Sequence, residues 1–335
     1  MRFSFPLFLF FLTLASCGPD SKTVRIKGEL KGIDQAVIMV HSDDALDTDG
    51  GGFDSIKVSR GAFSYDRPIE SPQLLTLVYP NFSTTTVIAQ PGATIHLTGE
   101  ANRLKEVQVS GTSDNELLTD FRLRSQRIAP SNVRMETASF IRSNAQTMAA
   151  VALFRQEFDA DEKRSLQPHL GLLDALIKAQ PDNVLLRNID QRLRPQLLTS
   201  VGGKLPNFKA KSLKGEEITS SSLKGKPTLL LFYATWDGEY YNLRQQLRRL
   251  RTSYGQRLNL VLLSLDGNLS DCRTTAQRDT LRNVIYAPGS LSAPLARQLG
   301  VRYVPGGLLL DAKGTIVARD VKVEEWHDEV KKLLK

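Results

Sequence analysis

The sequence predicts a multidomain chain with an N-terminal all-β sandwich, a helical connector and a C-terminal α/β domain. Three observations support this fold class. The 335 residues suffice for two or three domains of roughly 100–200 residues each. The 41% of hydrophobic residues exclude a wholly disordered chain. Strand-like runs with turn residues fill 22–112, helix-like periodicity fills 113–200, and strands alternate with helices in 201–335.

The first residues read as a secretory signal followed by an anchor. A basic Arg2 precedes an apolar run over 3–13, which is too short to span a membrane comfortably. The next four residues, Leu-Ala-Ser-Cys ending at Cys17, resemble the lipobox of bacterial lipoproteins. The resemblance implies a signal peptide over 1–16, lipid on Cys17, a tether over 17–21 and the membrane as a partner. An ordinary signal peptide with a chance cysteine is the alternative. Because no clear acidic run follows Cys17, we expect a cell-envelope protein anchored in the outer membrane and facing the periplasm.

Residues 22–112 carry the strand pattern. Alternating or buried runs lie at 23–28, 36–40, 74–79, 84–89 and 94–97. A further pair of runs, 55–58 and 62–65, surrounds Arg60-Gly61 and predicts a hairpin. Regular short strands with turns between them indicate a small β-sandwich. The stretches 53–65 and 90–95 resemble a domain of unknown function found at the N-terminus of lipoproteins from Bacteroides-type bacteria.

The middle of the chain is predicted to be helical and to connect the two flanking domains. A 3–4 spacing of apolar residues favours a helix over 145–158, and a second helix is expected over 162–179. Pro181 opens a third helix that has Pro195 near its end. We therefore expect a connector over 113–200.

The C-terminal part alternates strands and helices. The apolar run 228–233 is typical of a strand buried on both faces. An amphipathic helix follows over 242–254, with Leu243, Leu247 and Leu250 on one side. The remaining elements are a strand at 258–265, a short helix at 293–299, a strand-turn-strand unit at 307–317 and a closing helix at 324–334. The predicted order is β–α–β–α–β–β–α.

Several short motifs in 201–335 resemble the thioredoxin-like proteins of the TlpA/ResA and peroxiredoxin-related branch. These motifs are Leu-Pro-Asn-Phe at 205–208, Leu-Lys-Gly-Lys-Pro at 223–227, Trp236 after the buried strand, and Tyr-Val-Pro-Gly at 303–306. The resemblance implies a thioredoxin-like fold and an ancestry in thiol-disulfide exchange. In that family a Cys-x-x-Cys pair follows the tryptophan, whereas this chain has Asp237 and Tyr240 at those two positions. A carboxylate and a phenol cannot perform thiol-disulfide exchange, so we predict no catalytic residue there. Asp237 is expected to cap the following helix or, alternatively, to recognise a ligand.

Cys272 is the second of two cysteines in the sequence. If Cys17 carries lipid, Cys272 is the single thiol left for chemistry. It is either a structural thiol or the reactive group of an oxidoreductase or peroxidase-related enzyme. Arg273 would lower its pKa, and Asp271 would act in the opposite direction.

The sequence also suggests a binding surface that needs no cysteine. In the thioredoxin-like family the loop before Pro305 carries a cis proline and pairs with extended peptides, here through the backbone of Val304. Trp236, Tyr240 and Tyr241 would lie beside it, because loops at one edge of a sheet come together. Alternatively, Pro305 only turns the chain and Trp236 packs beneath its loop.

The leading interpretation is therefore an envelope lipoprotein with a redox-inactive thioredoxin-like domain that binds or scaffolds a protein or peptide. The alternative is a thiol-disulfide oxidoreductase or peroxidase-related enzyme that uses Cys272. A third interpretation assigns the binding role to the β-sandwich.

The charge distribution and the remaining motifs limit the classes of partner that the sequence allows. Residues 201–335 hold 22 Lys and Arg against 13 Asp and Glu, a net charge of +9, whereas the rest of the chain is near neutral. Arg244, Arg248 and Arg251 share one helix face, which is either solvated or faces an anionic partner. No nucleic-acid motif accompanies the charge, so nucleic acid is not expected. The segment 47–52 resembles a calcium loop but lacks its acids at Ala45 and Ile56, so we predict a flexible turn, no metal site and no cofactor.

Overall fold

The computed structural model describes residues 22–42, 53–159 and 166–335. The segments assigned to the signal peptide, the anchor at Cys17 and the turn at 47–52 lie outside these residues. The chain forms two compact units: one holds the described residues up to Pro130 together with Thr147–Ala152, and the other holds Ser131–Gln146 and Leu153–Lys335. Within the described ranges, no helix has both the length and the apolar character needed to cross a membrane.

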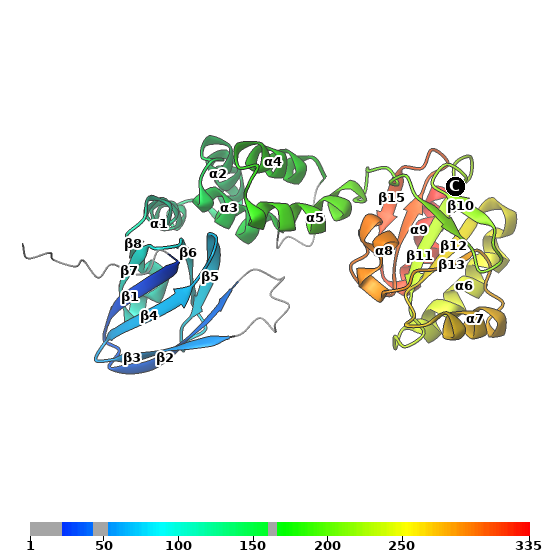
Figure 1. The fold of residues 1–335 in the computed structure, drawn as a ribbon. Coiled ribbons are helices and arrows are strands. Elements are labelled where there is room, and N and C mark those ends of the chain that lie inside the picture. The colour runs from blue at the N-terminus through cyan, green and yellow to red at the C-terminus, as the bar shows by residue number, and fades with distance from the viewer. Residues whose placement is uncertain (1–21, 43–52, 160–165) are drawn as a thin grey trace, which may run out of the picture. The chain divides into compact units, whose positions relative to one another are not determined.

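The N-terminal unit contains the expected strands, which hydrogen-bond into one continuous sheet. The eight strands lie in the order β6-β5-β2-β3-β4-β1-β7-β8, and only β1 and β7 pair in parallel. Their bounds are Thr23–Lys31 (β1), Gln35–Ser42 (β2), Asp54–Ser59 (β3), Ala62–Pro68 (β4), Gln73–Val78 (β5), Thr84–Ala89 (β6), Thr94–Glu100 (β7) and Gln108–Ser110 (β8). Side chains from every strand meet in one apolar core, so the sheet curls around that core (Figure 1). The two layers of the expected sandwich are thus two parts of a single sheet.

The predicted hairpin at Arg60-Gly61 is present. Ser59 faces Ala62, and the two turn residues between them have φ angles of 51° and 76°. Positive φ at both central residues defines the type I′ turn that matches the twist of two-residue hairpins. Glycine suits the second position, since a Cβ on Gly61 would lie 2.8 Å from the carbonyl oxygen of Leu30.

Helices follow the sheet, as expected for 113–200, and they are divided between the two units. Their bounds are Ser113–Ser125 (α1), Pro130–Ser143 (α2), Met148–Phe154 (α3), Leu166–Ala179 (α4) and Val184–Leu198 (α5). Helix α1 belongs to the N-terminal unit, where the Asn115 side chain donates to the carbonyl oxygen of Ile88 at 2.8 Å and accepts from its N–H at 2.9 Å. Helices α4 and α5 belong to the second unit, in which Arg192 pairs with the buried Asp159.

The C-terminal domain is an α/β fold around a five-stranded sheet. The strand order is β13-β12-β11-β14-β15, with β11 to β13 parallel and β14 and β15 antiparallel to their neighbours. The bounds are Lys209–Lys211 (β9), Glu217–Thr219 (β10), Thr228–Tyr233 (β11), Tyr240–Tyr254 (α6), Asn259–Ser264 (β12), Leu269–Arg278 (α7), Val284–Tyr286 (β13), Pro294–Gln298 (α8), Gly306–Leu310 (β14), Ile316–Arg319 (β15) and Trp326–Leu333 (α9). All six residues of β11 are buried, as the apolar run 228–233 predicts.

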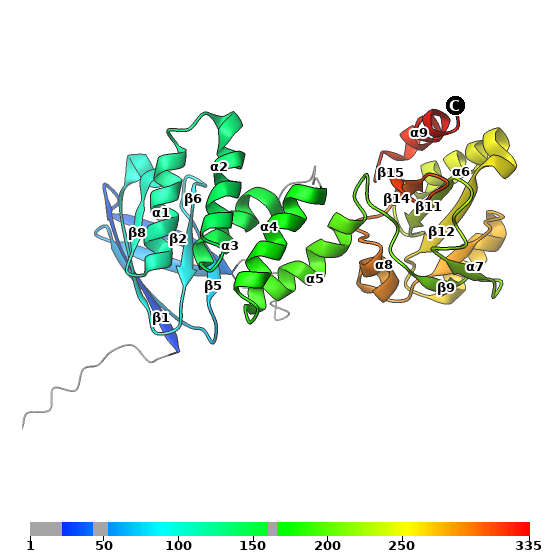
Figure 2. The same ribbon diagram turned by 90° about the horizontal axis from the view of Figure 1, so that it is seen from above.

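Both faces of this sheet are covered. On one face, Leu229, Leu231 and Tyr233 pack against α6, α7 and α9. On the other, Leu230 and Phe232 pack against α8 and the segment that precedes β11. Figure 2 shows α6 and α9 on one side of the strands and α8 on the other. Helices on both faces of this mixed sheet leave the strand ends as the exposed edge of the fold.

The predicted element order is incomplete at two places. Between β12 and α8 the structure has a further helix, α7, and a further strand, β13, which the apolar pattern did not separate. Helix α7 is short and mostly polar, and β13 has three residues, so neither gives a clear apolar period. The short hairpin of β9 and β10 was also not predicted.

Candidate functional site

The loop between β11 and α6 is fixed at its first residue by a buried carboxylate. The N–H and the hydroxyl of Thr235 donate to Asp266 Oδ1 at 2.6 and 2.7 Å. Asp266 is 1% exposed at the end of β12, and its second oxygen accepts from the hydroxyl of Ser264 at 2.7 Å. The parallel strands β11 and β12 end at the same edge of the sheet. These bonds therefore hold the loop after β11 against the sheet, while the next residue projects outward.

That next residue, Trp236, is 62% exposed. An indole this exposed is unusual, since tryptophan is highly buried on average. The alternative in which Trp236 packs beneath its loop is therefore wrong. Tyr241, on the first turn of α6, is 58% exposed, and Arg244 lies over its ring at 5.2 Å from the centroid.

Asp237 does not cap α6. The helix begins at Tyr240, its N-cap residue is Glu239, and no side chain caps it. Asp237 Oδ1 instead accepts from the N–H of Glu239 at 2.8 Å. The backbone carbonyl oxygen of Asp237 accepts from the N–H of Tyr240 at 3.1 Å. The side chain thus stabilises the turn before the helix, as aspartate commonly does in turns.

Tyr240 does not belong to an exposed surface. It is 8% exposed, stacks on Tyr233 with ring centroids 5.6 Å apart, and donates its hydroxyl to Asp279 Oδ2 at 2.7 Å. Burial raises the pKa of the Tyr240 phenol, and the hydrogen bond to Asp279 acts in the same direction. Its role is in the core, so the expectation that it joins Trp236 and Tyr241 in a binding surface is wrong.

The loop before β14 contains the expected proline turn. The Val304–Pro305 peptide bond is cis, and both residues are partly buried. Neither the N–H nor the C=O of Val304 has a hydrogen-bond partner among the described residues. Tyr303 beside it is 45% exposed.

A buried carboxylate holds this second loop as well. Asp320, whose side chain is 3% exposed, accepts from the N–H of Gly307 at 3.0 Å and from Arg302 Nη2 at 3.0 Å. Its carbonyl oxygen accepts from the Tyr303 hydroxyl at 3.0 Å. Arg319 pairs with the same carboxylate and donates to the carbonyl oxygens of Gly300 and Thr199. Sequence reasoning did not identify Arg302, Arg319 or Asp320.

The two loops leave the same end of the sheet. Phe232 near the end of β11 faces Gly306 at the start of β14 in the antiparallel pair. The chain before Gly306 and the chain after Phe232 therefore emerge side by side. We call the surface formed by Trp236, Tyr241, Tyr303, Val304 and Pro305 the loop surface.

Cys272 lies elsewhere, on α7, and is fully buried. Burial raises the pKa of its thiol, and hydrogen bonding with Ser264 offsets this only in part. A thiol with a raised pKa and no exposure is a poor nucleophile. Within the ranges that the structure describes, no three His, Cys, Asp or Glu side chains gather in a way that could hold a metal ion.

The comparisons agree with this architecture. Residues 24–118 match a domain of unknown function, DUF4369, and residues 201–319 match the AhpC/TSA family. The chain thus joins a strand-rich domain that matches DUF4369 to a thioredoxin-like domain that matches the AhpC/TSA family. Both predicted resemblances are confirmed at the level of these domains. Among the curated proteins, none matches the chain at a significant level.

Solved structures similar to the C-terminal domain include proteins from Bacteroides and Chlorobium species. The C-terminal domain of a thiol-disulfide oxidoreductase from Bacteroides thetaiotaomicron is 26% identical, with 41% of this chain and 97% of that chain covered and a TM-score of 0.38. A thiol-disulfide oxidoreductase from Bacteroides fragilis is 27% identical, with 39% and 98% covered and a TM-score of 0.36. A thiol:disulfide interchange protein DsbE from Chlorobium tepidum is 21% identical, with 41% and 99% covered and a TM-score of 0.37.

Proposed function

We propose that this protein is a lipid-anchored protein of the cell envelope whose thioredoxin-like domain binds an extended peptide segment and does not exchange disulfides. The observation that carries the proposal is the unpartnered backbone of Val304 next to exposed aromatic side chains. An N–H and a C=O without partners accept an added strand, and neighbouring side chains supply specificity. Trp236 and Tyr241 offer large contact areas with polar tips, which suits an anchor in a peptide interface.

Thiol chemistry has little support in this domain. In thioredoxin-like proteins of this kind, the exchanging cysteines stand at the positions that Asp237 and Tyr240 occupy here. One of these side chains stabilises a turn and the other is in the core. The alternative enzyme would have to use Cys272, which is buried on another helix.

We expect the purified protein to be inactive as a disulfide reductase. In an insulin-reduction assay with dithiothreitol, precipitation should proceed at the rate seen without the protein, because exchange needs an accessible thiolate. Cys272→Ser should leave this result unchanged. Reduction of insulin or of hydrogen peroxide that disappears in Cys272→Ser would instead establish the one-cysteine enzyme.

Peptide binding is tested with linear peptides selected against the protein from a random library. Trp236→Ala should weaken the selected peptides by about 30-fold, because an aromatic anchor contributes about 2 kcal/mol or more. Fluorescence anisotropy of labelled peptides measures the dissociation constant. Backbone N-methylation of the peptide at alternate positions should weaken binding to a similar degree, since it removes the donors that would pair with Val304.

The matched control is Phe82→Ala, which removes an aromatic side chain that is 88% exposed in the N-terminal domain. This variant should bind the peptides as the unmodified protein does. Equal losses in Phe82→Ala and Trp236→Ala, or no loss in either, would place peptide binding away from the loop surface. Loss in Phe82→Ala alone would favour the N-terminal domain as the binding unit.

The anchor forms a separate part of the proposal. We expect Cys17→Ala to release the protein from membranes or to block removal of the signal peptide, because stable anchoring needs acyl chains on that residue. Fractionation and the mass of the mature protein measure both effects. An unchanged mass with unchanged membrane partitioning would exclude lipidation at Cys17. Protease accessibility in intact cells tests the expected orientation towards the periplasm.

A further inference from the structure

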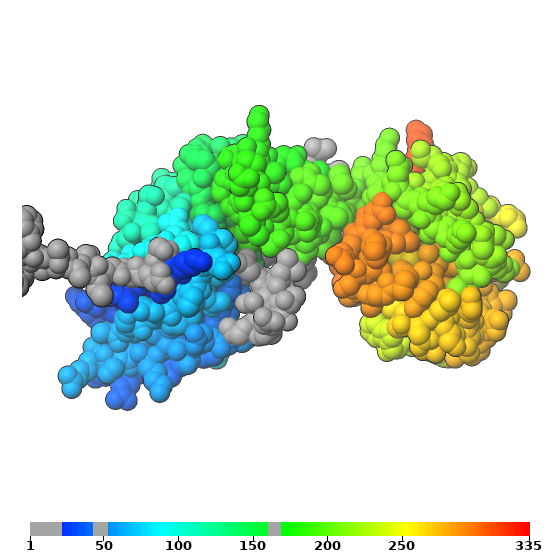
Figure 3. Space-filling model, in the orientation of Figure 1, coloured from blue at the N-terminus to red at the C-terminus, as the bar shows by residue number. Residues whose placement is uncertain are grey.

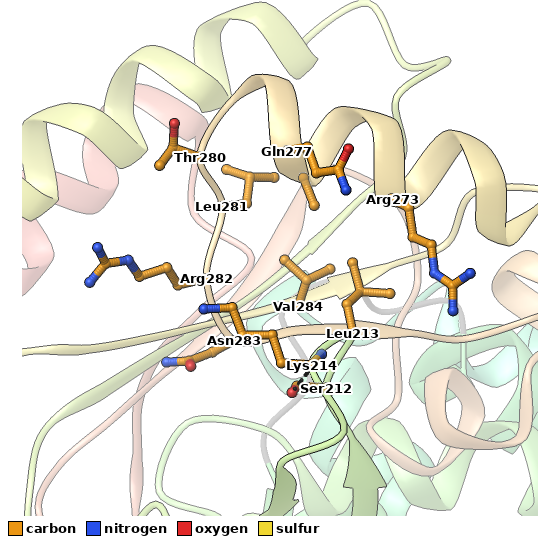
Figure 4. A pocket seen from close by; sticks show the side chains of 11 residues that line it. Ser212, Leu213, Lys214, Arg273, Gln277, Thr280, Leu281, Arg282, Asn283 and Val284 are labelled. Atoms are coloured by element: carbon orange, nitrogen blue, oxygen red, sulfur yellow. Dashed lines mark hydrogen bonds between the residues drawn. The ribbon is translucent and has the colours of Figure 1, made fainter.

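The C-terminal domain contains a cavity of about 440 Å³ that is not part of the loop surface. It lies between the segment that follows β9, the C-terminal half of α7 and the turn that leads into β13 (Figure 4). Figure 3 shows the surface of this domain, on which the yellow-green part of the chain that includes this segment lies beside the golden yellow part that includes α7. A cavity of this size is in the range that takes a small organic molecule.

The floor of the cavity is apolar and fixed. Ala276, Leu281 and Val284 line it and are at most 8% exposed, and Leu213 covers it from the opposite segment. The N–H of Leu213 donates to the carbonyl oxygen of Val284 at 2.8 Å, which holds that segment on the edge strand of the sheet. The protein's own contacts therefore hold the hollow in shape.

The rim of the cavity is cationic. Lys214, Arg273 and Arg282 line it, their side chains are exposed, and the lining includes no aspartate or glutamate. Figure 4 shows Arg273 and Arg282 towards opposite ends, with Lys214 between them. Within the described part of the chain, none of these three side chains has an ion pair or a hydrogen bond, whereas Arg278 and Arg244 nearby are paired with Asp279.

A fourth cation adds to the unbalanced charge. Arg251 donates from Nη1 to the carbonyl oxygen of Thr280, a lining residue, at 2.8 Å. Burial lowers the pKa of Arg251, and the charge of Arg282 acts in the same direction. Like charges gathered around a cavity whose lining holds no carboxylate repel one another, and a bound anion would relieve that repulsion.

We propose that this cavity binds a small organic anion with an apolar body and a phosphate or carboxylate head. The apolar floor would take the body, and the guanidinium groups of Arg273 or Arg282 would bind the head through paired N–H donors. Gln277 and Asn283 at the rim supply further neutral hydrogen-bonding groups. The proposal does not depend on the function of the loop surface, whose residues do not line the cavity.

Binding is measured by calorimetry on the full chain with four probes. 1-Naphthyl phosphate and 1-naphthoate carry both a body and a charge, 1-naphthol carries only the body, and inorganic phosphate carries only the charge. At least one naphthyl anion should bind about tenfold or more tightly than both 1-naphthol and phosphate, since hydrogen bonds to charged groups are the stronger ones. The tighter of the two identifies the head group. Equal affinity for 1-naphthol would overturn the proposal.

Two variants locate the site. Arg273→Gln combined with Arg282→Gln should weaken the preferred anion about tenfold or more, whereas Arg249→Gln combined with Lys331→Gln removes the same charge from exposed positions outside the cavity and should change affinity less than about twofold. Gln277→Trp, an exposed position, should block binding while all the cations remain. Circular dichroism checks that each variant is folded. Similar losses in both charge variants, or full binding by Gln277→Trp, would show that the anion does not occupy this cavity.

Discussion

Replacing Asp320 with asparagine is expected to lower the free energy of unfolding of the C-terminal domain by about 3–5 kcal/mol, the usual cost of leaving a buried charge without its partner. Arg319 has a side chain that is 7% exposed and pairs with this carboxylate, and Arg302 pairs with it from the loop before β14. Asparagine keeps an oxygen for the N–H of Gly307 but removes the charge. It also tolerates the φ angle of 49° at this position, so the variant separates loss of charge from backbone strain.

Urea unfolding followed by tryptophan fluorescence measures this effect. Both tryptophans of the chain, Trp236 and Trp326, lie in the C-terminal domain, so the signal reports on that domain. The control is Asp328→Asn, a carboxylate whose side chain is 75% exposed, which should change stability by less than about 0.5 kcal/mol. If Asp320→Asn costs no more than the control, the carboxylate does not hold Arg302 and Arg319 as described. Selected peptides should also bind Asp320→Asn more weakly, because the loop that contains Val304 loses its support.

The sequence was informative where the signal is local. The run 228–233 predicted a fully buried strand because consecutive apolar side chains can only be buried together when both faces are covered. Arg60-Gly61 predicted its hairpin because the turn needs two residues with positive φ. The leucine stripe of α6 was found through its period, and Tyr240 stands three residues before Leu243 on the same face. Extending that stripe by one turn would have placed Tyr240 in the core and Tyr241 outside.

The features that the sequence did not predict depend on contacts between distant parts of the chain. Asp320 binds Arg302 and Gly307, residues 18 and 13 positions earlier, and nothing in its neighbourhood in the sequence announces them. The cavity joins a segment at 212–214 to one at 273–284, so its cations are brought together only by the fold. Helix α7 offered one usable sign, Asn268, whose side chain accepts from the N–H of Asp271 as an N-cap. One capping residue beside so short an apolar pattern was not enough to distinguish this helix from a loop.

Two buried carboxylates in the thioredoxin-like domain support the loop surface, and each of them holds one of its two loops. Asp266 fixes the start of the loop that presents Trp236, and Asp320 fixes the loop that presents Val304. Neither carboxylate is needed to activate a thiol in a chain that has no cysteine in either loop. Their burial has a desolvation cost, which the hydrogen bonds to Thr235 N–H and Gly307 N–H offset. Two loops held in this way can serve binding without any thiol chemistry.

Acid should weaken the C-terminal domain through Asp279, by about 2 kcal/mol between pH 4 and pH 2. Burial would raise the pKa of this carboxyl group, but hydrogen bonds from Arg278, Tyr240 and Arg244 outweigh it and lower the pKa to about 2 from an ordinary value of 3.8. Because the pKa is lower in the folded state, the carboxylate contributes its full stability above about pH 4. That contribution is lost as the pH falls through the folded value, and it amounts to about 1.4 kcal/mol for each pH unit that separates the unfolded pKa from the folded one.

The measurement compares the unfolding free energy of the unmodified protein with that of Asp279→Asn at several pH values from 5 to 2, again by tryptophan fluorescence in urea. Other carboxyl groups titrate in the same range, but they contribute equally to both proteins and cancel in the difference. We expect the variant to be less stable at pH 5 and the two curves to converge towards low pH, because a protonated Asp279 loses its advantage over asparagine. Curves for Asp279→Asn that run parallel to those of the unmodified protein would show that the three donors do not hold this group in its charged form.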